Sequence, residues 1–290
     1  MRSCGRVSLG MKFGVTIFPT EDAIHPVELG KRLEERGFES LFVPEHTHIP
    51  TSRRTPFPGG GKLPREYART YDPFVTLTAV AAATDKLVLA TGVCLLTERD
   101  PIVTAKQVAS LDHFSGGRFV FGVGAGWNEE EMQNHGTDPR QRWKVLRERV
   151  EAMKAIWTQE RARYNGDHVR IEELWQWPKP LQSPHPPVYL GASTEAALPR
   201  VVRYADGWLP SGLRGIRDFA PYIRKLEAMC EEAGRPLPPV SVYGAEASEE
   251  AVRIHADAGI ERVIFRLPSA PADEVTPLLE RYAELMHRFA

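Results

Sequence analysis

The chain has 290 residues, of which 42% are hydrophobic, so it is long enough to bury a large core as one domain or as two ordinary ones. Lys and Arg together number 37 and Asp and Glu 38, which gives a net charge of −1. This balance gives no reason to expect a nucleic acid or an anionic membrane surface as a partner. No run of residues approaches the roughly 18 consecutive apolar residues of a membrane helix, so we expect no membrane association.

The cysteines and the first residues indicate a compartment. Cys4, Cys94 and Cys230 are odd in number and lack the spacing of a metal site, which favours a reducing compartment, by default the cytoplasm. Residues 1–10 lack the apolar run of a signal peptide. We expect them to form an N-terminal extension, with Met11 as an alternative start, and residues 11–290 to form one domain.

Short runs rich in Val, Ile and Phe alternate with amphipathic segments along the whole chain. The runs predict strands at residues 12–18, 40–46, 87–93, 118–124, 187–193, 206–212, 240–245 and 262–268. The amphipathic segments predict helices at residues 26–38, 72–86, 100–117, 142–160, 194–205, 217–235, 248–260 and 272–289. Eight alternating strand-helix units predict an α/β fold, namely a (β/α)8 TIM barrel, with a doubly wound open sheet as the alternative.

Two connections are longer than a barrel needs, so we expect insertions after strand two and between strands four and five. The first, residues 47–71, is rich in Pro, Gly and Arg, and the second, residues 164–186, contains Trp175 and Trp177. The loop after a barrel strand lies on the catalytic face, so we expect the first insertion to serve function more than the second. We expect the two loops together to close the pocket.

The stretch RFVFGVGAGW, residues 118–127, raises the question of what its glycines are for. Gly122, Gly124 and Gly126 are spaced G-x-G-x-G, and Trp127 follows them, so the dinucleotide fingerprint G-x-G-x-x-G fails on spacing. A glycine inside a strand marks either close packing or a surface that a ligand approaches. On this stretch alone both interpretations remain open.

The predicted carboxyl ends of the strands carry few charges and many glycines, which favours a flat cofactor over a metal. His46-Thr47-His48 has the H-x-H spacing of barrel metallohydrolases, but the fifth and sixth strand ends supply no histidine, so we keep a metal site only as an alternative. A hydrogen-bonded structural role for His46 is a further alternative. Residues 191–195, GASTE, open a predicted helix, where backbone N–H groups could hold a phosphate or where Ser193 or Thr194 could simply cap the helix.

The segments LATGVCLL, RDPIVTAKQVASLDHFSGGRFVFGVGAGWNEEE, PPVYLGAS and ADGW together resemble the bacterial luciferase-like monooxygenases, most closely their branch that depends on the deazaflavin coenzyme F420. The resemblance covers nearly the whole chain from Met11. It implies a barrel that binds F420, with FMN as the alternative cofactor, and moves hydride to or from a small organic substrate. It also implies a homodimer, for which the helix at residues 100–117 is a candidate contact.

The resemblance also assigns residues. It implies a bulge with a cis non-prolyl peptide that supports the cofactor ring, and a cofactor-phosphate site at the GAST turn. The implied cofactor-binding residues are Thr91, Gly92, Val93, Cys94, Gly124, Gly126, Trp127, Gly191, Ala192, Ser193 and Thr194. His46 matches the position of a proton donor or substrate positioner, and Glu129 is the second catalytic candidate because the family's glutamate position holds Trp127 here.

Three alternatives stay open at this point. The first is an FMN-dependent monooxygenase that binds reduced flavin and activates oxygen. The second is a barrel that binds a ligand without chemistry. The third concerns the basic residues of the first insertion, which either meet the acidic tail of F420 or are solvated surface charge, and which are Arg53, Arg54, Lys62, Arg65 and Arg69.

Overall fold

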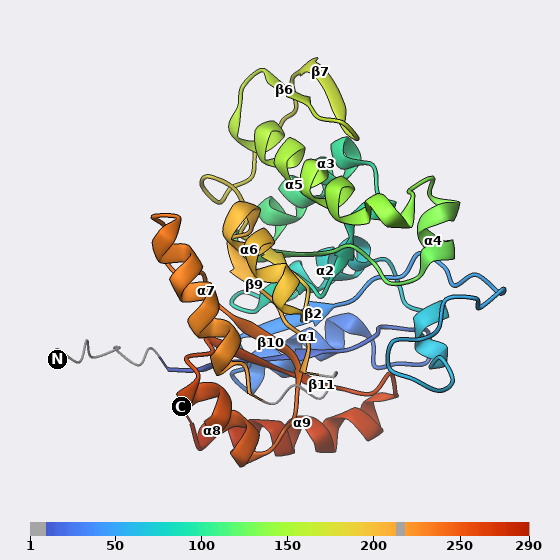
Figure 1. Cartoon of the computed structure of the whole chain (residues 1–290). Coiled ribbons are helices and arrows are strands. Elements are labelled where there is room, and N and C mark those ends of the chain that lie inside the picture. Colours follow the sequence, from blue (N-terminus) through green and yellow to red (C-terminus); the bar gives the residue numbers. More distant parts are fainter. Residues whose placement is uncertain (1–9, 213–217, 290) are drawn as a thin grey trace, which may run out of the picture.

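The computed structural model describes residues 10–212 and 218–289, so nearly all of the extension predicted at residues 1–10, Cys4 included, lies outside it. In the described part, a ring of strands is surrounded by helices (Figure 1). The eight ring strands are β1 Lys12–Thr16, β2 Ser40–Val43, β3 Val88–Thr91, β5 Phe119–Gly124, β8 Val188–Leu190, β9 Gly207–Trp208, β10 Ser241–Ala245 and β11 Arg262–Arg266. Each lies within a predicted strand, so all eight predictions are confirmed.

The strands are parallel and follow the order β10-β11-β1-β2-β3-β5-β8-β9. Single bridges between Trp208 and Val240 and between Ser211 and Tyr243 join the two ends of this order, so the sheet is a nearly closed barrel. The short strand β4, Cys94–Leu95, pairs with β5 beside the end of β3. The predicted (β/α)8 barrel is therefore confirmed, and the open-sheet alternative is wrong.

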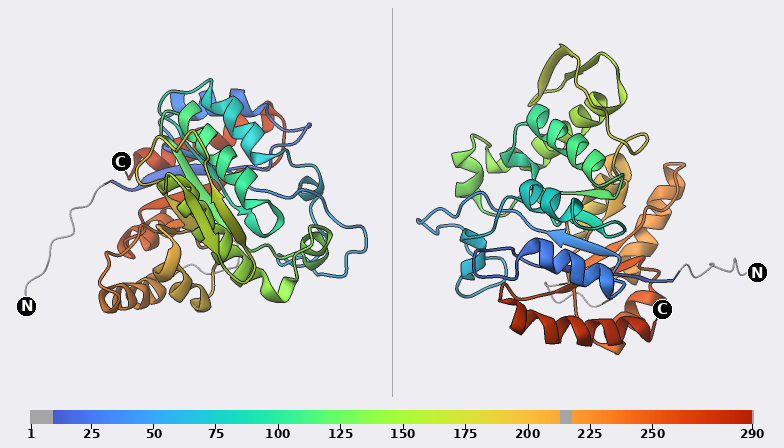
Figure 2. Two further views of the ribbon diagram at one scale, coloured as in Figure 1. Left: turned by 90° about the horizontal axis from the view of Figure 1, so that it is seen from above. Right: turned by 180° about the vertical axis from the view of Figure 1, so that it is seen from behind.

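The helices cover the outside of the barrel, as the views from above and behind show (Figure 2). Two of them begin at an Asp-Pro pair: Asp100 accepts a hydrogen bond from the N–H of Val103 at 2.8 Å, and Asp72 caps its own helix in the same way. The described helices are α1 Pro26–Glu35, α2 Pro73–Ala81, α3 Pro101–Phe114, α4 Glu129–Asn134, α5 Arg142–Thr158, α6 Leu198–Tyr204, α7 Ala220–Glu232, α8 Glu249–Asp257 and α9 Ala272–His287. None of them is long and apolar enough to cross a membrane.

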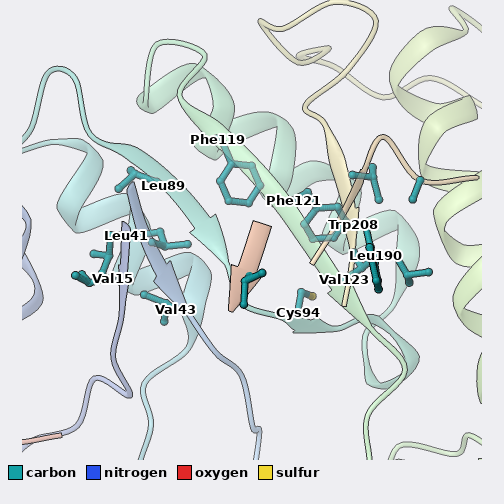
Figure 3. Packing of buried hydrophobic residues seen from close by; sticks show 14 of the residues in the cluster. Val15, Leu41, Val43, Leu89, Cys94, Phe119, Phe121, Val123, Leu190 and Trp208 are labelled. Carbon is teal, nitrogen blue, oxygen red and sulfur yellow. The ribbon is translucent and has the colours of Figure 1, made fainter. Parts of the chain in front are cut away.

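The alternation of side chains on β5 explains which glycines face the site. Phe119, Phe121 and Val123 belong to the large buried cluster between the strands and the helices (Figure 3). Burying each phenyl group stabilises the fold by about 1.5–3 kcal/mol. Because successive residues of a strand face opposite sides, Gly122 and Gly124 face the inside of the barrel. The glycines therefore lie on the face from which the site is built.

The second insertion does not close the pocket, so that expectation is wrong. It begins with an antiparallel hairpin, β6 Ala162–Asn165 and β7 Arg170–Leu174, and continues along the outer face of α3. There Gln176 donates to the carbonyl of Ile102 at 3.0 Å, and Gln182 donates to Asp112 at 2.6 Å. The segment connects α5 to β8 on the outside of the barrel. It therefore runs over the helix α3 and does not reach the strand ends that surround the cavity.

Candidate active site

A cavity of about 770 Å³ opens at the carboxyl ends of the strands. The first insertion contributes Phe57, Pro58, Gly59, Pro64 and Tyr67 to its wall, which confirms that this insertion covers the site. Most of the predicted site residues line the cavity, namely His46, Gly92, Val93, Gly124, Gly126, Trp127, Glu129, Gly191, Ala192, Ser193 and Thr194. The strand ends thus bring together residues more than 140 positions apart in the sequence.

Thr91 and Cys94 are exceptions, because neither lines the cavity. Both side chains are completely buried. The hydroxyl of Thr91 donates to the carbonyl of Gly122 at 2.7 Å, and Cys94 packs in the core, where burial raises the pKa of its thiol. Both side chains pack at the end of β3 and do not face the cavity.

The bulge at the end of β3 has the cis peptide that the resemblance implies, between Gly92 and Val93. The side chain of Val93 lies in a notch between two other strand ends. A Cβ atom added to Gly124 would lie 2.5 Å from Val93 Cγ2, and one added to Gly191 would lie 2.5 Å from Val93 Cγ1. Since no real contact is that short, a side chain at either position would force Val93 to move.

This notch changes the interpretation of the glycine strand. The expectation was that its glycines let a cofactor approach directly, but a Cβ at Gly122 would lie 2.0 Å from the carbonyl oxygen of Thr91. Gly126 is explained by its backbone, since its φ of +74° is a turn conformation that favours glycine. The close neighbours of these glycines belong to the chain itself, and Val93 presents the resulting surface to the cavity.

His46 has a partner on each ring nitrogen. Its Nδ1 lies 2.7 Å from Glu131 Oε2, and the indole Nε1 of Trp127 donates to its Nε2 at 3.3 Å. An indole N–H only donates, so Nε2 accepts and Nδ1 carries the proton of the neutral ring. The hydrogen-bond partners thus assign the tautomer, in which the lone pair of Nε2 is the basic group on the Trp127 side.

The carboxylate beside His46 is Glu131 and not Glu129. Glu131 is fully buried, and its Oε1 also accepts the backbone N–H of Thr47 at 3.0 Å. The Glu129 side chain is 55% exposed at the rim, 3.9 Å from the guanidinium of Arg142. Of the three consecutive glutamates, Glu130 and Glu131 are buried and Glu129 is not, and the N-cap Asn128 at the start of α4 was the available signal.

A second acidic layer lies beneath this pair. Burial, together with the charges of Glu131 and Glu45, raises the pKa of Glu98 to about 9, so Glu98 is neutral near pH 7. Glu45 is compensated, because its Oε1 accepts from Arg99 Nε and its Oε2 from the N–H of Leu95, both at 2.6 Å. The expectation of few charges concerned the strand ends, and the layer buried below them carries several carboxyl groups.

Aromatic side chains form the wall beside His46. The ring of Tyr67 lies 4.5 Å from that of Phe18, 5.2 Å from that of Phe57 and 5.3 Å from that of His46, measured between centroids. Phe57 also lies 5.9 Å from Trp127. All of these residues line the cavity. Such a wall makes the space next to His46 Nε2 largely aromatic and suits the apolar part of a substrate.

The basic residues of the first insertion are engaged elsewhere. Arg54 pairs with Glu130 at 3.2 Å, Arg65 pairs with Asp22 at 2.6 Å, and Arg69 pairs with Glu21. Arg53 lies over the ring of Trp127. None of the five predicted basic residues, Lys62 included, is among the lining residues, so the expectation that they meet a cofactor tail is not supported; Arg142 and Arg266 are the cations that line the cavity.

The GAST turn lines the cavity but caps no α-helix with a side chain. The Ser193 hydroxyl accepts the N–H of Ser211 at 2.8 Å, and Thr194 precedes a short 3-10 turn without a side-chain bond to it. The α-helix α6 begins four residues later, at Leu198. Simple capping by Ser193 or Thr194 is therefore wrong, and the turn leaves its backbone and hydroxyl groups at the cavity.

The two histidines of the H-x-H motif have separate partners. Whereas His46 contacts Glu131 and Trp127, the Nε2 of His48 lies 2.8 Å from the amide nitrogen of Asn134. Within residues 10–212 and 218–289, no group of three or more His, Cys, Asp and Glu residues is placed to hold a metal ion. The motif therefore has no support as a pair of metal ligands in the described chain.

Comparisons with known proteins identify the family and the fold. The profile of the luciferase-like monooxygenases matches residues 11–287. An uncharacterised protein of Mycobacterium tuberculosis is 40% identical over 278 residues, which cover 94% of this chain and 98% of that protein. The solved structure of the monooxygenase RslO1 from Streptomyces bottropensis has a TM-score of 0.78 at 21% identity and covers 97% of this chain and 100% of that one, which shows a shared fold.

Two further relatives depend on different cofactors. The F420-dependent glucose-6-phosphate dehydrogenase of Nakamurella multipartita is 32% identical over 214 residues, 72% of this chain and 59% of that protein. The FMNH2-dependent dimethylsulfone monooxygenase of Pseudomonas putida is 32% identical over 184 residues, 62% of this chain and 50% of that protein. The chain therefore belongs to the luciferase-like monooxygenase family, whose members are oxidoreductases that depend on F420 or on a flavin.

Proposed function

We propose that this protein is an F420-dependent oxidoreductase that transfers hydride between the coenzyme and a small organic substrate in the cavity. The observation that carries the proposal is His46, whose Nδ1 faces the carboxylate of Glu131 and whose Nε2 lies on the Trp127 side of the cavity as a hydrogen-bond acceptor. Hydride chemistry at a carbon that bears oxygen also moves a proton, and Nε2 is placed to accept it. The coenzyme supplies the hydride acceptor, and the protein supplies orientation and the proton acceptor.

The residues of the cavity fit a flat tricyclic cofactor. Its volume of about 770 Å³ lies in the range of pockets that hold a cofactor or drug-sized ligand, roughly 300–1,000 Å³. Gly92, Gly124 and Gly191 contribute no side chain, and Val93 is the apolar surface between them. Ser193 and Thr194 of the GAST turn and the guanidinium of Arg142 line the same cavity and are the groups proposed to face the cofactor phosphate.

The arrangement of His46 supports the direction of substrate oxidation. When a C–H and O–H bond of an alcohol are broken, the hydride leaves with its electron pair and the hydroxyl proton goes to His46 Nε2. Glu131 then faces an imidazolium whose Nδ1–H it already accepts, which stabilises the new charge. Trp127 donates to the same Nε2 in the structure, so a substrate hydroxyl would take the place of the indole N–H.

An FMN-dependent monooxygenase is the second candidate. The similarity to the FMNH2-dependent dimethylsulfone monooxygenase supports it, and a flat apolar floor suits either ring. A barrel that only binds a ligand is a more distant candidate, and the buried His46–Glu131 pair beside the cavity gives such a protein no evident use.

We further propose a homodimer in a reducing compartment, the cytoplasm. The outer face of α2, α3 and the second insertion exposes large apolar side chains, namely Val75, Ile102, Val103, Phe114, Trp175, Trp177 and Leu181. Apolar faces of this kind mark sites of association, and a second copy of the chain is the occupant we propose. Cys94 and Cys230 are free and buried, in keeping with a reducing compartment.

The test is an equilibrium titration of the purified protein, freed of bound cofactor, with F420 and with FMN, each oxidised and reduced, followed by fluorescence or absorbance. Selective binding of F420 in the micromolar range is expected. Preferential binding of reduced FMN would replace the proposal by the monooxygenase. Binding of neither cofactor would bring the ligand-binding barrel forward.

A further inference from the structure

Four aromatic side chains form a closed circle at the end of the cavity where His46 lies. Measured between ring centroids, His46 is 5.3 Å from Tyr67 and 5.7 Å from Trp127. Phe57 closes the circle at 5.2 Å from Tyr67 and 5.9 Å from Trp127, and these two rings lie 6.5 Å apart across it. Rings at such separations touch one another. We call these four residues the aromatic box, and it has no room for a further ring between its members.

Phe57 is the outer member of the aromatic box, and its own turn holds it there. The N–H of Gly60 donates to the carbonyl of Phe57 at 2.9 Å, and Gly60 has a φ of +75°. A Cβ atom added to Gly59 would lie 2.5 Å from Phe57 Cε1, so the ring folds back over its turn. The ring is half-buried, whereas the side chain of His46 is only 5% exposed. Phe57 therefore closes the box on the solvent side.

Helix α4 holds His46 and the loop of Phe57 at the same time. Glu131 Oε2 lies 2.7 Å from His46 Nδ1. The preceding residue, Glu130, accepts the N–H of Thr55 at 3.0 Å and its hydroxyl at 2.5 Å, and Thr55 lies two positions before Phe57. Both carboxylates are buried. Two neighbouring residues of one helix thus set the spacing between the base and Phe57.

The indole of Trp127 stands where a substrate would meet the base. Its Nε1 donates to His46 Nε2 at 3.3 Å, so a substrate hydroxyl has to take that place. The indole is itself enclosed, because Phe57 and Tyr67 contact its ring and Arg53 lies over it. It can yield only slightly while Phe57 is in place. The carbon skeleton that carries the hydroxyl must therefore be small.

The charges beside the aromatic box favour a neutral substrate. Arg266 lines the cavity and pairs at 3.0 Å with Glu66, the neighbour of Tyr67 in the sequence. A carboxylate or phosphate on the substrate would compete with Glu66 for this guanidinium, and repulsion between the two like charges is costly. A neutral alcohol meets no such competitor.

We propose that Phe57 determines which substrates reach His46, because it limits the apolar group on the reacting carbon to a short alkyl chain and excludes an aryl ring. The alcohol loses a hydride from its carbon to oxidised F420 and its hydroxyl proton to His46 Nε2, and it becomes a ketone. The inference rests on the proposed function, because only a reaction at His46 Nε2 places the substrate beside the aromatic box.

The alternative is that Phe57 only holds the first insertion in place. A loosened insertion lowers kcat/KM for every substrate alike, whereas loss of a size limit changes kcat/KM in opposite directions for small and large substrates. Glu130→Gln weakens the anchor at Thr55 and keeps the phenyl ring, so it shows what a loosened insertion does. Pro56→Ala is the matched control, because Pro56 is an exposed neighbour of Phe57 that does not line the cavity.

The first readout is binding without turnover. Acetophenone and 2-butanone are titrated into the protein with labelled histidines, saturated with whichever oxidised cofactor it binds, F420 or FMN, or empty if it binds neither. A ketone cannot react with an oxidised cofactor, and the His46 ring resonances in NMR spectra report binding beside this residue. We expect Phe57→Ala to bind acetophenone about tenfold more tightly than the wild type and 2-butanone no more tightly. An unchanged affinity for acetophenone in Phe57→Ala, at the wild-type melting temperature, overturns the inference.

The second readout is turnover of F420 with 2-butanol and with 1-phenylethanol. We expect the wild type to prefer 2-butanol, and Phe57→Ala to raise kcat/KM about tenfold for 1-phenylethanol and to lower it about tenfold for 2-butanol. Glu130→Gln should lower both values, and Pro56→Ala should change neither. A parallel loss for both alcohols in Phe57→Ala overturns the inference. If the wild type oxidises neither alcohol, the proposed function fails, while the binding of the two ketones still decides whether Phe57 limits the space beside His46.

Discussion

The distance of 2.7 Å between His46 Nδ1 and Glu131 Oε2 joins two side chains that are 5% and 0% exposed. A hydrogen bond between buried groups is stronger than one in water, because no solvent competes for either partner. The pair therefore fixes both the orientation of the imidazole ring and the nitrogen that carries its proton.

His46→Ala should lower turnover far more than cofactor binding. Removal of a positioned general base costs about 10²- to 10⁴-fold in kcat, whereas the ring of His46 contributes only one part of the cavity wall. The measurement compares kcat with the dissociation constant of F420 from the titration. Equal losses in both would assign His46 a role in shape and not in catalysis.

Glu131→Gln should reduce kcat with little change in KM. The amide of glutamine donates through its nitrogen, so it favours the His46 tautomer with the proton on Nε2, the nitrogen that Trp127 also faces as a donor. The tautomer is measured by long-range correlation of the ring protons and nitrogens in NMR spectra. Glu172→Gln, on the exposed strand β7, makes the same change of charge far from the site and serves as the control. A wild-type kcat and tautomer in Glu131→Gln would contradict the role given to this carboxylate.

The barrel and the position of the site at one end of it can be predicted from the sequence. The partners of the charged side chains cannot. Strand periodicity places the eight ring strands and brings His46, Trp127 and the GAST turn to one end of the barrel. The choice between Glu129 and Glu131 depends instead on where a six-residue helix begins, and a difference of two residues turns the side chain from the rim to the interior.

Long-range pairing limits what the sequence predicts. The Arg54–Glu130 contact crosses 76 positions, so a cluster of arginines in one loop gives no sign of whether its charges are free or paired. The course of the second insertion could not be predicted for the same reason. The insertion follows α3 because of hydrogen bonds to residues about 70 positions away, such as the bond between Gln182 and Asp112.

Gly124→Ala should destabilise the fold and weaken cofactor binding together. The new Cβ would lie 2.5 Å from Val93 Cγ2, so Val93 must move, at a cost of about 1–3 kcal/mol in the free energy of unfolding. Adding Val93→Ala removes the clashing methyl groups and should return part of that stability. Denaturant unfolding of the two single variants and the double variant measures the coupling. Strictly additive effects would show that Val93 and Gly124 do not constrain each other.

Stability should fall as the pH rises, through Glu98. Burial and neighbouring carboxylates raise its pKa from 4.5 to about 9 in the folded state, so between these values the folded chain holds a proton that the unfolded chain lacks. By linkage, the free energy of unfolding then decreases with rising pH across this window and is unaffected by Glu98 below it.

Glu98→Gln removes this titration and keeps a neutral side chain of the same shape. The variant should match the wild type near pH 4.5 and exceed it by about 1 kcal/mol or more near pH 9, measured by denaturant unfolding across the range. A difference that stays constant with pH would show that Glu98 is not the group that titrates. A variant less stable than the wild type at pH 9 would show that burial does not keep the Glu98 carboxyl group protonated in the folded state.

Val103→Glu combined with Trp177→Ser should separate the proposed dimer into monomers. Both residues lie on the exposed apolar face, at 57% and 59% exposure, and Trp177 is held against α3 because its carbonyl accepts from Lys106. A stable interface buries about 1,200–2,000 Å² in total, and a charge within its apolar centre is costly because it loses water without gaining a partner. Light scattering or sedimentation gives the mass of the wild type and of the variant, with Arg253→Ala on the exposed side of α8 as the control. A wild type that is monomeric at micromolar concentration would contradict the dimer, and a double variant that stays dimeric would move the interface to another face.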